Sequence, residues 1–146
     1  MLKKILISMG IVAVVALFLF SCSSDSGGPK LAGTWTISTA PDGGTTDFGS
    51  GTFTVSFFTT VSMSGQTFHL YIGSGSLNPG TFEVSVVENE STSTDNITIT
   101  FEDPADENNS IDFYGTLNDS RNSASGDYDG WGIYISDYGT FTATKQ

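Results

Sequence analysis

The chain has 146 residues, 38% of them hydrophobic, and its 16 Asp and Glu against 5 Lys and Arg give a formal net charge of −11. Such an acidic excess argues against nucleic acid as a partner, because the phosphates would be repelled. A single cysteine, Cys22, excludes a disulfide within the chain.

The N-terminus has the layout of a secretory signal peptide. Lys3 and Lys4 precede an apolar run from Ile5 to Phe20, and the small residue Ser21 follows it. A permanent membrane span is the alternative. Sixteen residues reach only about 24 Å as a helix, however, which is short of the roughly 30 Å hydrocarbon core. We expect residues 1–21 to be a cleaved signal peptide.

The four residues Leu19-Phe20-Ser21-Cys22 resemble the lipobox of bacterial lipoproteins, with Phe20 bulkier than the usual occupant. The resemblance implies that Cys22 is lipidated after the cut and holds the protein on a membrane. Ser23 next to it implies the outer membrane of a Gram-negative bacterium. The alternative is a free thiol at Cys22.

The small polar segment "SSDSGGP" at 23–29 is typical of a flexible tether, so we assign residues 22–30 to the lipidated cysteine and its tether. Residues 31–146 are long enough for one domain and thin for two. After the cut, three cations oppose 16 acids, a net charge of −13. We expect a monomer.

The domain alternates apolar and polar residues with a period of two and shows no helical periodicity, which predicts strands. The expected inward residues fall into eight groups separated by turn-forming stretches: Trp35 and Ile37; Phe53, Val55 and Phe57; Phe68, Leu70 and Ile72; Phe82, Val84 and Val86; Ile97, Ile99 and Phe101; Ile111, Phe113, Gly115 and Leu117; Ala124, Gly126 and Tyr128; Phe141 and Ala143. This pattern predicts an all-β, eight-stranded antiparallel up-and-down meander that closes into a barrel, with a β-sandwich as the alternative.

The opening "LAGTW", Leu31 to Trp35, and the closing "GTFTATK" resemble bacterial lipocalin-like, calycin-type lipoproteins. Gly33 and Trp35 match the Gly-x-Trp of that family. The resemblance implies a lipocalin-like barrel in which the indole packs across the closed end. The helices that flank lipocalin barrels have no evident counterpart here.

An eight-stranded barrel is just wide enough to be filled by side chains or to hold one small ligand. Six aromatic residues at expected inward positions could line such a pocket, or equally fill it: Phe57, Phe68, Phe82, Phe101, Phe113 and Tyr128. Our leading hypothesis is a non-catalytic binding module for a small apolar or amphipathic ligand.

A second group of aromatics is expected outside the barrel or in loops: Phe58, Tyr71, Tyr114, Trp131 and Tyr134. Exposed Tyr and Trp serve as contact residues. The alternative hypothesis is therefore a surface interaction protein with a packed core that binds a glycan or a protein. If Asp129–Gly139 is simply a long hairpin, Ile133 and Ile135 would cap the barrel.

The sequence offers little to catalysis or to metal binding. The lone His69 is expected on the outward face, and metal sites and catalytic triads need several convergent groups. Acidic loops at 102–109 and 127–130 leave calcium open as an alternative to solvated turns. We expect no enzyme, no metal site and no cofactor.

Overall fold

The computed structural model describes residues 30–146. The predicted signal peptide, Cys22 and the tether up to residue 29 lie outside the described residues. In the described part of the chain, no helix is long and apolar enough to cross a membrane.

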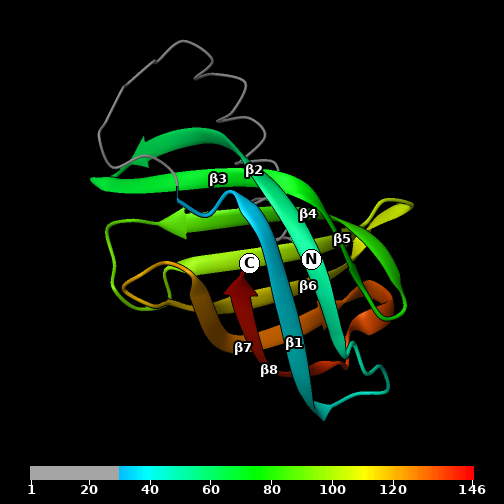
Figure 1. Cartoon of the computed structure of the whole chain (residues 1–146). Coiled ribbons are helices and arrows are strands. Elements are labelled where there is room, and N and C mark those ends of the chain that lie inside the picture. Colours follow the sequence, from blue (N-terminus) through cyan, green and yellow to red (C-terminus); the bar gives the residue numbers. More distant parts are fainter. Residues whose placement is uncertain (1–29) are drawn as a thin grey trace.

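Eight antiparallel strands follow one another around a closed barrel, and β1 pairs with β8 to complete it (Figure 1). The strands are β1 Gly33–Gly43, β2 Ser50–Met63, β3 Gln66–Leu77, β4 Gly80–Asn89, β5 Ile97–Asp103, β6 Asp106–Leu117, β7 Ser123–Trp131 and β8 Tyr138–Lys145. A short 3₁₀ helix, η1 Gly132–Tyr134, lies between β7 and β8. The predicted all-β, up-and-down barrel is confirmed, and it is consistent with a lipocalin-like fold.

The meander places alternate connections at opposite ends of the barrel. We call the end where β1 begins the proximal end; it also carries the β2–β3, β4–β5 and β6–β7 connections. The other end, which we call the distal end, carries the β1–β2, β3–β4, β5–β6 and β7–β8 connections. With 11 residues in β1, about 3.3 Å per residue and a tilt of about 40°, the ends lie about 28 Å apart.

Aromatic rings from several strands meet in the middle of the barrel. The ring of Phe101 lies 5.7 Å from that of Phe53 and 5.5 Å from that of Phe113, measured between centroids. Phe113 in turn lies 5.2 Å from Phe141. These edge-to-face contacts join β2, β5, β6 and β8 across the interior, which is therefore a core packed with side chains.

The predicted orientation of β3 is wrong. His69 and Tyr71 point into the barrel, with 7% and 0% of their surface exposed, whereas Ile72 lies outside and is 51% exposed. A Cβ atom at Gly75 would lie 2.7 Å from Cβ of Phe53 and 2.9 Å from Cε1 of Phe101. The inward face of β3 therefore needs a glycine where Phe53 of β2 and Phe101 of β5 approach it. Phe68, which alternates with these inward residues, is only half-buried and does not line the core.

Strand β2 departs from regular pairing between Phe57 and Thr59, where its register with β3 shifts. Such a bulge bends the strand and leaves one extra residue, here Phe58, without a register partner in β3. Phe57 still pairs with Tyr71, and its ring lies 5.9 Å from that of Tyr71. It remains 41% exposed, however, so it lies at the solvent-exposed edge of the inward face and not in the sealed core.

Trp35 lies where the family resemblance implies. Its indole is 1% exposed, stacks on Phe53 at 6.0 Å, and donates a 2.9 Å hydrogen bond from Nε1 to the carbonyl oxygen of Leu31. Leu31 precedes β1 and is itself 1% exposed. The segment before the first strand thus folds over the proximal end and helps to close it.

Candidate functional site

The barrel interior holds four of the six aromatics proposed as pocket residues. Phe82, Phe101, Phe113 and Tyr128 are each at most 4% exposed. The gap between side chains beside Trp35 has no room for a water molecule. These four side chains therefore fill the core. A groove of about 520 Å³, open to solvent, lies elsewhere, along the proximal parts of β6, β7 and β8.

The distal end is closed by two aromatic residues from different connections. Phe48 of the β1–β2 connection is fully buried, and its ring lies 5.7 Å from Tyr128 and 5.3 Å from Tyr134. Tyr134, in η1, is only 6% exposed. Tyr134 was expected on the surface, but the 3₁₀ turn points it inward, and it plugs the distal end.

The same turn points the neighbours of Tyr134 outward. Ile133 and Ile135 are 71% and 73% exposed, the highest values among the large hydrophobic residues described. The expectation that they cap the barrel is therefore wrong. We call these two residues the distal tip.

The distal tip is held in a defined conformation by its surroundings. The side-chain oxygen of Asn109 in β6 accepts a 3.0 Å hydrogen bond from the backbone N–H of Ile133. Gly132 has a φ of +66°, and a Cβ atom there would lie 2.2 Å from the same oxygen. Glycine is thus required both by the left-handed backbone and by the close approach of Asn109.

Asp137 ties the β7–β8 connection to the β1–β2 connection. Its Oδ1 accepts hydrogen bonds from the backbone N–H groups of Thr45 at 2.6 Å and Thr46 at 3.0 Å, and the residue is 3% exposed. Burial alone would raise the pKa of Asp137, but the hydrogen bonds from Thr46 and Thr45 outweigh burial and hold it below the ordinary value.

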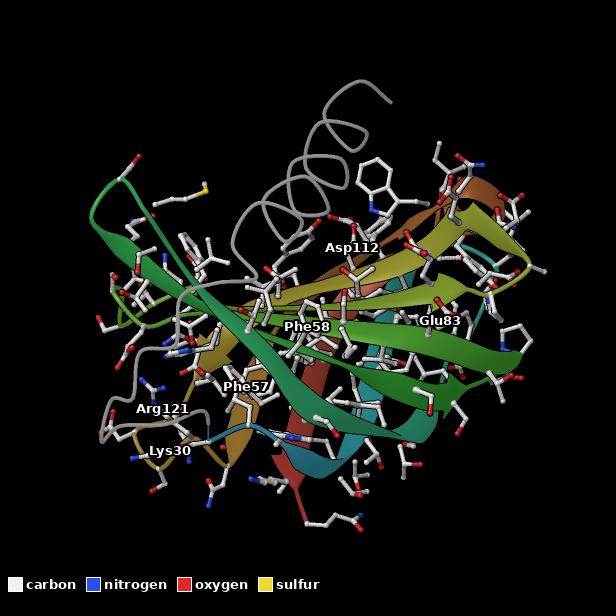
Figure 2. All side chains as sticks on the ribbon, turned by 90° about the horizontal axis from the view of Figure 1, so that it is seen from above. Lys30, Phe57, Phe58, Glu83, Asp112 and Arg121 are labelled. Carbon is white, nitrogen blue, oxygen red and sulfur yellow. The ribbon has the colours of Figure 1, made fainter. Side chains whose placement is uncertain are left out.

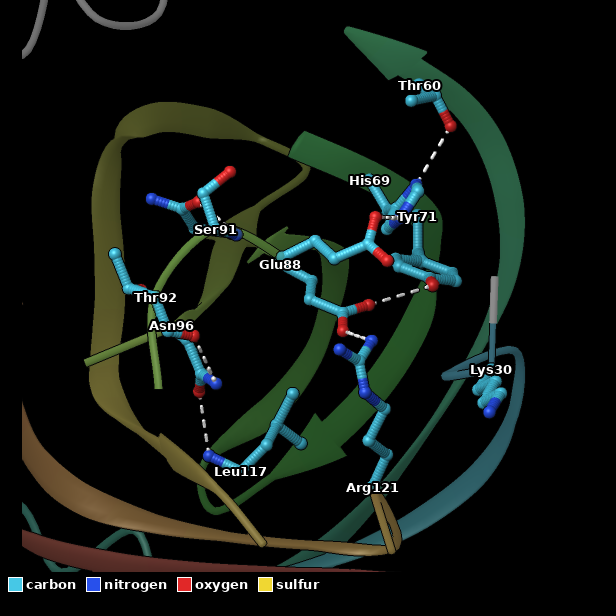
Figure 3. Close-up of polar contacts among 12 residues, drawn as sticks. Lys30, Thr60, His69, Tyr71, Glu88, Ser91, Thr92, Asn96, Leu117 and Arg121 are labelled. Atoms are coloured by element: carbon cyan, nitrogen blue, oxygen red, sulfur yellow. Dashed lines mark hydrogen bonds and ion pairs between the residues drawn. The ribbon is translucent and has the colours of Figure 1, made fainter. Parts of the chain in front are cut away.

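A second group of polar side chains closes the proximal end (Figure 3). The carboxylate of Glu88 is fully buried, forms an ion pair with Nη1 of Arg121, and accepts a 3.2 Å hydrogen bond from the hydroxyl of Tyr71. Arg121 has a φ of 54° in the β6–β7 turn, which directs its side chain back over the barrel. Burial raises the pKa of Tyr71, and the charge of Arg121 offsets part of that increase. Tyr71 was expected on the surface and belongs to this cluster instead.

His69 lies beside this cluster and bridges two strands and a loop. Its Nδ1 lies 2.8 Å from the hydroxyl oxygen of Thr60, and its Nε2 lies 2.9 Å from a carboxylate oxygen of Glu90. The catalytic sites of many hydrolases contain the same sequence of groups, a hydroxyl, an imidazole and a carboxylate joined by hydrogen bonds. Here strand pairing accounts for one half of the arrangement, since Thr60 is the register partner of His69 in β2; Glu90 lies just past the end of β4, two residues after the register partner Glu88.

The other proposed contact residues differ in their surroundings. Tyr114 is 42% exposed on the outer wall and donates a 3.1 Å hydrogen bond to Oδ2 of Asp112. Burial and the charge of Asp112 raise the pKa of Tyr114. Trp131 is half-buried at the end of β7. Only Tyr114 among the four proposed Tyr and Trp residues is therefore extensively exposed.

The acidic segment 102–109 uses its carboxylates to shape a turn, whereas residues 127–130, also expected as a loop, lie within β7. Oδ1 of Asp103 accepts a hydrogen bond from the N–H of Ala105 at 2.8 Å, and Oδ1 of Asp106 accepts one from the N–H of Asn108 at 3.0 Å. Across residues 30–146, no group of three or more His, Cys, Asp or Glu side chains is placed to hold a metal ion.

No protein-family model, curated protein or solved structure matches the sequence.

Sequence reasoning missed the distal tip and the Glu88–Arg121 pair. A signal for the tip was present, because two isoleucines in a glycine- and aspartate-rich connection are unusual. Nothing local marks Glu88, which continues the alternating pattern of β4 at an inward position. Its partner is 33 residues away in sequence.

Proposed function

We propose that this protein is a lipid-anchored lipoprotein of the bacterial cell envelope, held in the outer membrane through Cys22, whose barrel is a rigid, non-catalytic scaffold for a protein-binding surface. The distal tip, Ile133 and Ile135, is the contact site. The observation that carries the proposal is the pairing of these two exposed isoleucines with the buried plug Tyr134 between them.

The filled interior favours a surface function over the binding of a small apolar ligand inside the barrel. Four of the aromatics that could have lined a pocket are in the core, and both ends are closed. What remains available for binding is the outer surface.

The tip is suited to protein contact because it is apolar and preorganised. Isoleucine has no ring to stack on a sugar and no polar group to bond one, so a glycan fits it poorly. Burying an isoleucine side chain contributes about 1.5–3 kcal/mol. Because about 70% of each is still exposed, the pair offers about 2–4 kcal/mol, or roughly 30- to 900-fold in affinity. The fixed turn keeps the ordering cost low.

The topology also presents the tip favourably. The chain enters β1 at the proximal end, and η1 lies at the distal end, about 28 Å away. A barrel tethered through residues 22–30 would therefore hold its tip away from its own membrane.

Site-specific photocross-linking of the full-length protein in its own host tests this proposal. A photoreactive residue is placed at position 133 or 135, or at 138, where Tyr138 begins β8 at the same end and is 50% exposed. Position 72 serves as a control on the outer wall, where Ile72 is 51% exposed. We expect a discrete protein adduct from the distal positions and none from position 72. Equal labelling at all four positions, or none anywhere, would contradict the proposal.

A further inference from the structure

The positive charges of the described residues all lie at one end of the barrel. Lys30 precedes β1, Arg121 lies in the β6–β7 connection, and Lys145 ends β8, so all three are at the proximal end. The side-chain nitrogen of Lys145 donates a 2.7 Å hydrogen bond to the carbonyl oxygen of Lys30. Figure 2 shows Lys30 and Arg121 on one side of the molecule and Glu83, in the distal half of β4, toward the other.

The distal end carries acidic residues and, within residues 30–146, no lysine or arginine. The acids lie at or next to its connections: Asp42, Asp47, Asp103, Asp106, Glu107 and Asp129. The proximal cations are about 28 Å away, more than three times the roughly 8 Å screening length at physiological salt. They therefore do not neutralise the potential around the distal tip.

The buried tyrosines of the distal end respond to these charges. Burial raises the pKa of Tyr134, and the carboxylates of Asp103 and Asp137 raise it further. Tyr128 is affected in the same way by burial and then by Asp137, Asp47 and Asp42. Acids from three connections thus act on the region directly beneath the tip.

We propose that the distal tip docks into an apolar pocket of a partner protein that is rimmed by lysine or arginine. This inference rests on the proposed function and names the class of partner. Charge complementarity favours this class of partner, because two isoleucines surrounded by acidic residues match an apolar pocket surrounded by basic residues. An anionic membrane surface and a second copy of the distal end are both repelled by the same acids.

The test uses the protein that is cross-linked to position 133, purified and titrated onto the full-length lipoprotein in detergent. Two double variants remove the same charge: Asp47→Asn/Asp103→Asn at the distal end, and Asp95→Asn/Asp119→Asn at the proximal end. Asparagine keeps a side-chain oxygen for the hydrogen bonds that Asp47 and Asp103 accept from Gly49 and Ala105.

At low salt we expect the distal pair to weaken binding roughly 5- to 10-fold, and the proximal pair less than twofold. Raising the salt concentration should lower the affinity of the wild-type protein for the partner more than it lowers the affinity of the distal variant. Equal effects of the two pairs, a salt-independent affinity, or a cross-linked peptide without neighbouring lysine or arginine would overturn the inference.

The variant Ile133→Ser/Ile135→Ser separates this inference from the proposed function. If it abolishes binding while the distal charge pair has no effect, the tip is a contact site and the basic partner is wrong. If it binds as well as the wild type, both proposals fail.

Discussion

Replacing Arg121 with methionine should destabilise the barrel, because the carboxylate of Glu88 would stay buried without its counter-charge. Removing one partner of a buried ion pair costs about 3–5 kcal/mol. Tyr71 would still donate to Glu88, and the side chain of Arg121 is 27% exposed, so we expect the lower end of that range. A loss of about 3 kcal/mol lowers the melting temperature by about 12 °C in a domain of this size.

Urea denaturation followed by circular dichroism measures the free energy of unfolding for a double-mutant cycle. Glu88→Gln alone should cost about 1–2 kcal/mol, since the guanidinium can turn toward water. The double variant Arg121→Met/Glu88→Gln should return to within about 1 kcal/mol of wild type, a coupling of at least about 3 kcal/mol. Lys145→Met, a matched change at the same end of the barrel, should cost less than about 0.5 kcal/mol. If Arg121→Met unfolds within about 1 kcal/mol of wild type, Glu88 does not depend on this partner and the argument is refuted.

Asp137→Ala should destabilise the protein by about 2 kcal/mol at pH 7, because two backbone N–H groups lose their acceptor. The pKa of Asp137 in the folded protein lies below its ordinary value of 3.8. The carboxylate therefore stabilises the fold above that pH and ceases to do so as the pH falls through the folded pKa. If the difference in unfolding free energy between wild type and variant, measured in urea, does not shrink below pH 4, this reasoning is contradicted. Tyr134→Ala should remove the distal plug and lower the unfolding free energy by about 3–4 kcal/mol. Ile133→Ser/Ile135→Ser should change it by less than about 1 kcal/mol. Similar melting temperatures for these two variants would refute the assignment of plug and tip. Cys22→Ala should release the protein from membranes into the soluble fraction of the cell, and continued sedimentation with membranes would argue for another anchor.

The barrel itself could be predicted from the sequence because its signal is local. Alternation of apolar and polar residues and eight turn-separated segments predict a meander, and closure follows from the need to pair its edge strands. Trp35 was likewise identifiable, since a short motif at the start of the first strand marks it.

The orientation of β3 could not be predicted because both of its faces carry large apolar residues. Phe68, Leu70 and Ile72 form the more hydrophobic face. The other face carries Gly75, however, and only a glycine there leaves room for Phe53 and Phe101. Which face of β3 points inward thus depends on side chains of β2 and β5. The alternation of residues within β3 does not reveal these contacts.

The distal tip was misassigned for a related reason. A strand-like reading of residues 129–139 makes Ile133 and Ile135 the inward pair, whereas Gly132 starts a 3₁₀ turn that directs Tyr134 inward. The turn depends on Asn109, which lies 24 residues earlier in the sequence. Only the folded arrangement brings that acceptor to Ile133.

Native mass spectrometry of the full-length lipoprotein, purified gently from its own host, tests most directly whether the barrel is a solid scaffold. The account predicts the mass of the acylated polypeptide alone, with no further component released on denaturation. A reproducible additional mass that leaves on unfolding, and that persists in Ile133→Ser/Ile135→Ser, would show an occupied interior and contradict the account.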